Sequence, residues 1–306
     1  MLRKKLKLTE LPETNTFGSR PPEFALKPFI NESKPRLSKD NSATIEQTEP
    51  STAGVVPLWR RVYQLELELC DALKQIALPA GIAATYNPIE YAAELHLAYM
   101  QRFLDGPKPV LFLGMNPGPW GMCQSGVPFG YVPAVRDWMH LQGQVLKPIA
   151  ELAVRPVDGL SCTRSEQSGQ RWWGLYQMLC GTPEQFFRNC FVYNICPLAF
   201  FHAGGRNITP AEFKGAAKTR FQQVCTEHLK LALDLFNPAV IVSVGRYTED
   251  RVKALVKQNL LDANRIQLKC MPHPSPRSLN NTNWPEKAQQ WLEENGVMPY
   301  LRAREG

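Results

Sequence analysis

The stretch from Pro109 to Met122 constrains the fold of this chain more than any other. It opens with a continuous apolar run from Val110 to Leu113, which is typical of a strand buried on both faces. A dense series of glycines and prolines then forces the backbone into a tight loop, at positions Gly114, Pro117, Gly118, Pro119 and Gly121. Asn116 lies inside this loop, at the carboxyl end of the strand, where open α/β sheets bind their ligands. Turns also favour Asn, so the motif alone leaves both interpretations open.

Three further strand-like runs follow, and helical patterns separate them. The strands are expected at residues 191–198, 239–245 and 265–270. Helices are expected over residues 57–79, from about 88 to 106, and over 132–141, 171–179, 210–235, 246–260 and 285–294, with residues 143–170 irregular. This alternation predicts an α/β fold with a central four-stranded parallel sheet and helices on both of its faces.

Polar residues interrupt the strand ends in three places. Asn116 follows the first strand, Asn194 lies near the end of the second, and His273 follows the fourth. Parallel connections bring the carboxyl ends of all strands to the same edge of the sheet, so these three side chains are expected to meet there. Their convergence predicts a functional site.

The residue types at this edge restrict the chemistry. Asparagine is no general base, but its amide can orient a water molecule. The predicted loops contain no obvious carboxylate apart from Asp137, and no Ser–His or Cys–His pair can be assigned. Reactions in which bond cleavage runs ahead of nucleophilic attack are therefore favoured. His273 stands between Pro272 and Pro274, so its imidazole is held in a fixed direction, where it can donate to a developing oxyanion; a turn histidine is the alternative.

Two residues suggest a pyrimidine ligand. The side-chain amide of Asn194 offers a donor and an acceptor side by side, which complements O4 and N3–H of uracil and mismatches cytosine. An Asn that only satisfies its own strand end is the alternative. Phe129, between Pro128 and Gly130, offers a flat face for stacking a base, although packing in the core explains it equally well.

Composition sets the domain organisation. Residues 1–53 are polar, rich in Pro and Ser, and without hydrophobic period, which predicts a disordered tail before one domain at 54–306. The net charge of +7 favours a polyanionic partner. The basic cluster Arg3-Lys4-Lys5 with Lys7 fits either a nuclear import signal or a short basic tail. It is not expected to be a secretory signal, because no apolar run follows it. A metal cluster at Cys180, Cys190 and Cys196 is a minor alternative, since their spacing matches no known motif.

Five motifs, in this order, resemble the single-strand-selective monofunctional uracil-DNA glycosylases of the uracil-DNA glycosylase superfamily. The resemblance spans roughly residues 80 to 300. The motifs are Gly114-Met-Asn-Pro-Gly-Pro-Trp-Gly-Met122, Gly126-Val-Pro-Phe-Gly130, Arg136-Asp-Trp138, Asn194-Ile-Cys-Pro-Leu198 and His273-Pro-Ser-Pro-Arg277. The resemblance implies the three-layer α/β fold of that superfamily and a monofunctional glycosylase that removes uracil and 5-modified uracils, such as 5-hydroxymethyluracil, from single- and double-stranded DNA.

The resemblance also implies a role for each matching residue. Asn116 and His273 would be catalytic: Asn116 would position the attacking water, and His273 would stabilise the departing uracil anion. The residues implied in binding the base are Met115, Gly118, Phe129 and Asn194. Those implied in contacting DNA, as the start of a wedge, are Ser275, Pro276 and Arg277.

The position of Gly118 carries a further implication, because a residue without a side chain leaves room for a 5-substituent. No metal or organic cofactor is implied. The matched loops contain no Lys, so a lyase step through a Schiff base is not expected. A monomer that acts in the nucleus, without a membrane partner, is expected. Two alternatives remain: a non-catalytic binder of damaged DNA, and a nucleotide-binding enzyme with residues 114–118 as a phosphate loop. That loop has neither the dinucleotide nor the Walker spacing.

Overall fold

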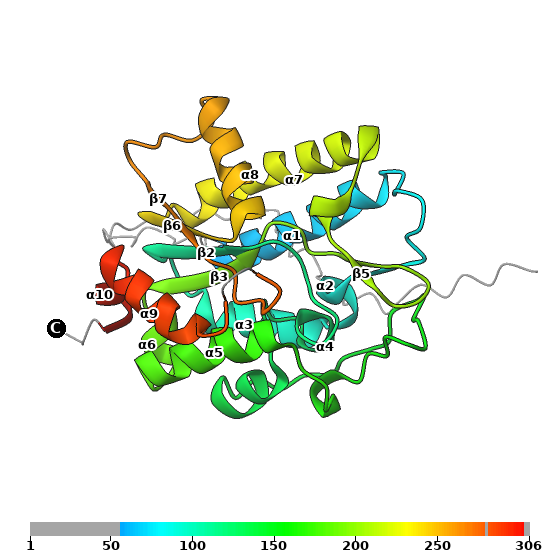
Figure 1. Ribbon diagram of the computed structural model, residues 1–306, viewed down its shortest axis with the longest axis horizontal. Helices are drawn as coiled ribbons and strands as arrows, with labels where there is room; N and C mark the ends of the chain where they lie inside the picture. Colours follow the sequence, from blue (N-terminus) through cyan, green and yellow to red (C-terminus); the bar gives the residue numbers. More distant parts are fainter. Residues whose placement is uncertain (1–55, 279–280, 303–306) are drawn as a thin grey trace, which may run out of the picture. The chain divides into compact units, whose positions relative to one another are not determined.

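A four-stranded parallel sheet lies at the centre of the fold. The computed structural model describes residues 56–278 and 281–302, so the predicted tail at 1–53 and its basic cluster lie outside the described residues. The strands are β2 (Val110–Gly114), β3 (Cys190–Asn194), β6 (Val240–Val244) and β7 (Gln267–Met271). They lie in the order β3-β2-β6-β7, and every neighbouring pair is parallel (Figure 1). The α/β prediction and its four parallel strands are confirmed.

Helices cover both faces of this sheet (Figure 1). The first group comprises α1 (Leu58–Lys74), α7 (Gly215–Phe236) and α8 (Arg246–Lys257), with α3 (Ala93–Phe103) packed on α1. The second group comprises α5 (Gln167–Cys180), α6 (Pro183–Phe187), α9 (Trp284–Glu294) and α10 (Met298–Arg302). Most of these helices were predicted; α6 and α10 are too short to show a period.

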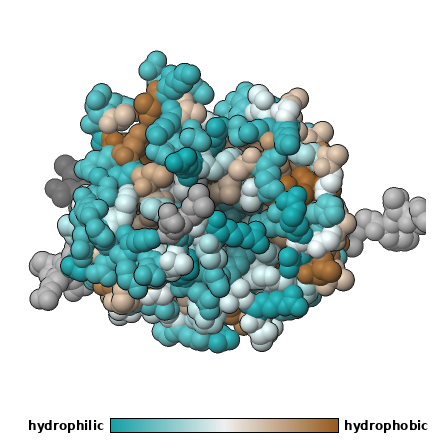
Figure 2. All heavy atoms as spheres, viewed as in Figure 1, coloured by the Kyte–Doolittle hydropathy of each residue, from teal (hydrophilic) through white to brown (hydrophobic). Residues whose placement is uncertain are grey.

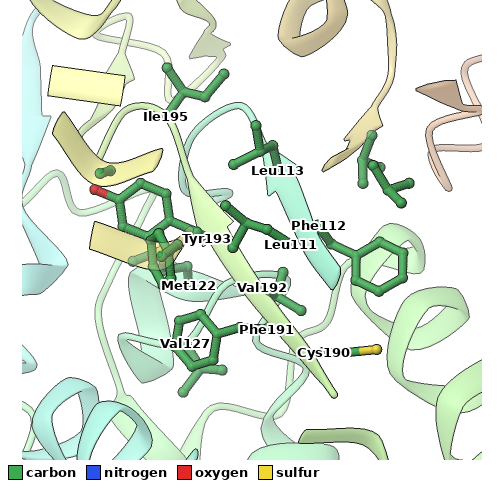
Figure 3. Packing of buried hydrophobic residues seen from close by; sticks show 14 of the residues in the cluster. Leu111, Phe112, Leu113, Met122, Val127, Cys190, Phe191, Val192, Tyr193 and Ile195 are labelled. Carbon is green, nitrogen blue, oxygen red and sulfur yellow. The ribbon is translucent and has the colours of Figure 1, made fainter. Parts of the chain in front are cut away.

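Aromatic side chains of the sheet pack against aromatic side chains of both groups of helices. Phe112 of β2 packs edge-to-face on Trp172 of α5, with ring centroids 5.3 Å apart. Tyr193 of β3 packs on Phe236 of α7 at 5.3 Å. All residues of β2, β3 and β6 are buried, as expected of parallel strands covered on both faces. Figure 3 shows the side chains of β2 and β3 filling the space beside the strands.

A second, smaller sheet was not predicted. Its strands β1 (Ala84–Tyr86), β4 (Ala199–Phe201) and β5 (Asn207–Ile208) are antiparallel, in the order β1-β4-β5. The strand predicted over 191–198 ends at Asn194, and the chain passes through Pro197 into this second sheet. Strands of two or three residues show no alternation long enough to detect. Short helical turns complete the domain: α2 (Pro88–Tyr91), α4 (Met122–Ser125), η1 (Ala134–Trp138), η2 (Gly159–Ser161) and η3 (Pro210–Glu212).

The face of the molecule in Figure 2 is covered mainly by hydrophilic residues, with hydrophobic ones in small separate groups. Among the described helices, none has the length and apolar character to cross a membrane.

Candidate active site

One cavity of about 760 Å³ opens at the carboxyl edge of the parallel sheet. The loops that follow β2 and β7 form much of its wall, together with Asn194 at the end of β3 and the connection from β4 to β5. The structure brings all the predicted site residues to this wall, namely Met115, Asn116, Gly118, Phe129, Asn194, His273, Ser275, Pro276 and Arg277. Such a crevice at the ends of parallel strands is where α/β folds bind their ligands.

Asn116 is held by its amide nitrogen. Its Nδ2 donates to the carbonyl oxygens of Pro117 at 3.2 Å and Leu198 at 3.3 Å. The backbone beside it is clamped to the loop after β3, because Ile195 N–H donates to Gly114 O and Cys196 N–H donates to Met115 O. Within the described residues, no donor reaches Oδ1 of Asn116, so this oxygen can accept a proton of water.

Asn194 lies at the end of β3, directly opposite Gly114 of β2 in the sheet register. Its side chain is only 7% exposed, and Nδ2 donates to Sδ of Met122 at 3.2 Å. A Cβ at Gly114 would overlap Oδ1 of Asn194, so glycine is required there for the amide to enter the cavity wall. Among the residues that the structure describes, nothing else bonds to this amide, so the second proton on Nδ2 and the oxygen Oδ1 remain for a ligand.

Phe129 occupies a strained backbone position, with φ of 54°. Its ring stacks on Trp172, with centroids 4.6 Å apart and planes at 15°. The side chain is half-buried and also lines the cavity. The two readings of the sequence therefore both hold in part: the ring packs on the core, and it also borders the cavity.

His273 is present as a neutral imidazole with a defined tautomer. Burial lowers the pKa of His273 to about 4, so the ring is uncharged at neutral pH. The backbone N–H of Ser275 donates to Nδ1 at 3.1 Å, which makes Nδ1 the acceptor and places the proton on Nε2. In the described part of the chain Nε2 has no hydrogen-bond partner, so it is a free donor on the cavity wall.

Three side chains hold the loop that carries His273. Asn281 Nδ2 donates to the carbonyl oxygens of His273 at 2.9 Å and Ser275 at 2.6 Å. Arg171 of α5 donates to Pro274 O at 3.1 Å, and Trp284 Nε1 donates to Pro272 O at 2.8 Å. This support fixes the direction of the imidazole before any ligand binds.

A carboxylate that the sequence analysis missed also lines the cavity. Glu166 precedes α5, in the segment predicted to be irregular, and its Oε1 accepts the Trp120 N–H at 2.9 Å. The carboxylate that was singled out, Asp137, is exposed and paired with Arg136 at 2.7 Å. The expectation of a site without a carboxylate other than Asp137 is therefore wrong. The sequence pattern did not place Glu166 at the site, because α5 was predicted to begin four residues later and Glu166 therefore fell in the irregular segment.

Arginine side chains contribute to the wall of the cavity. The arginines on its wall are Arg155, Arg206 and Arg277. Arg155 and Arg164 lie over the ring of Trp120, at 5.1 and 4.6 Å from its centroid. Arg277 is exposed, and its backbone N–H donates to Ser275 Oγ at 3.3 Å. Arginines around an aromatic ring suit the binding of a phosphate backbone with unstacked bases.

The suggested metal cluster is not formed. Within residues 56–278 and 281–302, no group of three His, Cys, Asp or Glu side chains is arranged to hold a metal ion. All eight cysteines are free thiols. Burial raises the pKa of Cys190 and Cys196 well above the ordinary value for a thiol, so neither is a ready nucleophile.

The family model of the uracil DNA glycosylase superfamily matches residues 102–294. The single-strand selective monofunctional uracil DNA glycosylase of Bos taurus is 46% identical over 239 residues, covering 78% of this chain and 87% of that protein. The corresponding protein of Rattus norvegicus is 42% identical over 258 residues, covering 83% and 92%.

A solved structure agrees with the fold. The crystal structure of wild-type Pedobacter heparinus SMUG2 superposes with a TM-score of 0.55 at 19% identity, over 79% of this chain and 100% of that chain. At this identity the likeness supports the three-layer α/β fold alone.

Proposed function

Because this chain belongs to the uracil DNA glycosylase superfamily, in the group of the single-strand selective monofunctional enzymes, we propose that it hydrolyses the N-glycosidic bond of uracil in DNA and leaves an abasic site. One observation carries the proposal: a free amide oxygen on Asn116 and a free imidazole N–H on His273 border the same cavity. The first suits the positioning of a water, and the second suits a leaving anion.

In the proposed mechanism, Asn116 and His273 act on opposite ends of the breaking bond. Oδ1 of Asn116 accepts a hydrogen bond from water and directs the water oxygen toward the sugar C1′. An amide cannot take up the proton, so cleavage of the glycosidic bond runs ahead of attack, and the proton that the water loses on bonding to C1′ passes to solvent or to the departed uracil anion. Nε2–H of His273 donates to O2 of the base as negative charge develops there. A preorganised donor of this kind contributes roughly 3 kcal/mol, about a hundredfold or more in rate.

Recognition of the base rests on Asn194 and Phe129. The amide of Asn194 donates to O4 and accepts from N3–H, and the ring of Phe129 stacks on the base. Cytosine presents the reversed pattern at this edge, so a buried amide rejects it. The backbone of Met115 and Gly118 completes the wall. Because C1′ and the base edge are inaccessible within a stack, the nucleotide must be flipped into the cavity.

Uracils with a substituent at C5, 5-hydroxymethyluracil among them, are included in the proposed substrates. Gly118 supports this extension, since it presents no side chain to the base.

Both single- and double-stranded DNA are proposed as partners. Ser275, Pro276 and Arg277 would enter the gap that the flipped nucleotide leaves, where a wedge offsets part of the cost of unstacking. We further propose a monomer that acts in the nucleus; sedimentation of the purified chain and the position of a fluorescent fusion in cells test these two points.

The primary test is base release from an oligonucleotide with a single uracil, in the presence of EDTA, by the wild type and Asn116→Ala. The wild type is expected to release free uracil and leave an intact abasic strand, and the variant to lose this activity while still binding the oligonucleotide. Glu286→Gln, on the exposed first turn of α9, serves as a surface control. Tight binding without release by the wild type would instead favour a protein that only binds damaged DNA.

A further inference from the structure

The carboxyl group of Glu166 fills the space beside Gly118. A Cβ built at Gly118 would overlap both carboxylate oxygens of Glu166, and one at Gly121 would lie 3.3 Å from Oε2. Both Gly118 and Glu166 line the cavity. The space beside Gly118 is therefore not empty. Because Gly118 has no side chain, the carboxyl group of Glu166 lies there and faces the cavity.

This carboxyl group is held in a defined orientation. Trp120 N–H donates to Oε1 at 2.9 Å, and Ser168 Oγ lies 3.5 Å from Oε2. Burial raises the pKa of Glu166, while the bonds from Trp120 and Ser168 and the charge of Arg155 act in the opposite direction. A carboxylate offers about four acceptor positions, so capacity remains for a further donor.

The proposed pose of the base decides which of its atoms faces Glu166. In a pyrimidine ring, C5 lies directly across from C2. With O2 held by His273, a substituent on C5 points to the side of the cavity away from His273. His273 packs on Gly245 at the end of β6, where a Cβ would lie 3.3 Å from that of His273. Glu166 instead packs on the loop after β2, around Gly118 and Trp120.

We propose that Glu166 is a specificity-determining residue that accepts a hydrogen bond from a hydroxyl-bearing substituent on C5 of the base. The inference rests on the proposed function and deepens it, since it names the group that reads C5. Hydroxymethyl and hydroxyl substituents satisfy the carboxyl group. A methyl group offers no donor to the remaining acceptor positions of the carboxyl group and shields them from water, which disfavours thymine.

Two variants separate this role from a structural one. In Glu166→Gln, Oε1 still accepts from Trp120 N–H, so the new NH₂ group replaces Oε2 beside Gly118 and presents donors to the base. In Glu166→Ala the reading group is absent. Glu286→Gln makes the same carboxyl-to-amide change on the exposed first turn of α9 and is the matched control.

The assay measures kcat/KM for base release from single-stranded oligonucleotides that carry uracil, 5-hydroxymethyluracil or 5-formyluracil. The formyl group only accepts hydrogen bonds. Glu166→Gln is expected to raise the ratio of formyl to hydroxymethyl substrate about tenfold, because a donor now faces C5. Glu166→Ala is expected to lower the ratio of hydroxymethyluracil to uracil about tenfold, and Glu286→Gln to leave both ratios unchanged.

Equal losses on all three bases would assign Glu166 only to holding Trp120 and would overturn the inference. If Glu166→Ala does not fold, the isosteric Glu166→Gln decides the matter alone. A wild type that releases no base from any of the oligonucleotides would refute the proposed function, and the role of Glu166 with it. A wild type that releases the bases, with ratios that the variants do not change, would refute the role of Glu166 alone.

Discussion

Replacing His96 with leucine is expected to destabilise the protein strongly and to loosen the loop that carries Phe129. His96 of α3 is 1% exposed, and Glu66 of α1 is 4% exposed. Nε2 of His96 lies 2.7 Å from Oε2 of Glu66, and Nδ1 donates to the carbonyl oxygen of Gly126 at 2.7 Å. One imidazole thus joins two helices to the start of the loop that ends in Phe129.

The magnitude follows from the burial of both partners. His96→Leu leaves the Glu66 carboxylate buried without its cation, and breaking a buried pair in this way costs about 3–5 kcal/mol. For a domain of this size, 1 kcal/mol shifts Tm by about 2–4 °C, so a loss of roughly 6–20 °C is expected. Lys253→Met breaks the solvent-exposed pair with Glu249 on α8 and serves as the control, with little change in stability expected.

Urea unfolding followed by tryptophan fluorescence measures the free energy of unfolding of each variant. The double variant Glu66→Leu/His96→Leu is expected to be more stable than the sum of the single changes predicts, since it buries no unpaired charge. A cost for His96→Leu no greater than that for Lys253→Met would refute the reasoning, as would strict additivity in the double variant.

The same pair predicts a dependence on pH. Burial lowers the pKa of His96, but the charge of Glu66 and the hydrogen bonds to Glu66 and Gly126 outweigh burial and raise it above the ordinary 6.5. The folded state therefore holds the proton more tightly than the unfolded state. This contribution to stability is complete below pH 6.5 and is lost as the pH rises through the raised pKa. In His96→Leu, the free energy of unfolding should not show this decrease between pH 6.5 and the raised pKa of His96.

Three other substitutions test the cavity. His273→Leu should lower kcat for uracil release about a hundredfold or more. Because the pKa of His273 is about 4, protonation of this residue should not lower the wild-type rate near pH 6.5. A loss of rate near pH 6.5 that disappears in His273→Leu would contradict the neutral donor. Gly114→Ala should push the side chain of Asn194 from its position and lower kcat/KM for uracil about a hundredfold. Unchanged kinetics would show that activity does not require the amide of Asn194 at this position. Arg277→Ala should weaken binding to uracil-containing duplex about tenfold and binding to single strands less, as measured by fluorescence anisotropy, and equal losses on both would argue against a wedge.

The central sheet and the placement of the predicted site residues could be read largely from local sequence. A strand buried on both faces must be apolar throughout, and the glycines and prolines after Leu113 end it at a defined point. Once four such strands alternate with helices, parallel connections bring Asn116, Asn194 and His273 to one edge of the sheet. These features depend on neighbours in the chain and on the handedness of connections, which a single sequence contains.

The state of each side chain, by contrast, was decided by contacts between distant segments. Ser275, two residues along the chain, fixes the tautomer of His273, but the neutral charge of the ring depends on its burial among other segments. The orientation of the Asn116 amide depends on Leu198, which lies 82 residues away and accepts from its nitrogen. Glu166 reaches the cavity because α5 packs close to the Phe129 loop, where a Cβ at Gly169 would lie 2.5 Å from Phe129 O.

The chain by itself therefore determined which strands form, where they end and which polar residues follow them. The tertiary structure alone decided the burial that keeps His273 neutral, the pairing of His96 with Glu66 and the carboxyl group beside Gly118. The physical reason is that burial and hydrogen bonding act through space. Partners such as Glu66 and His96, 30 residues apart, leave no periodic trace in the sequence that would announce their contact.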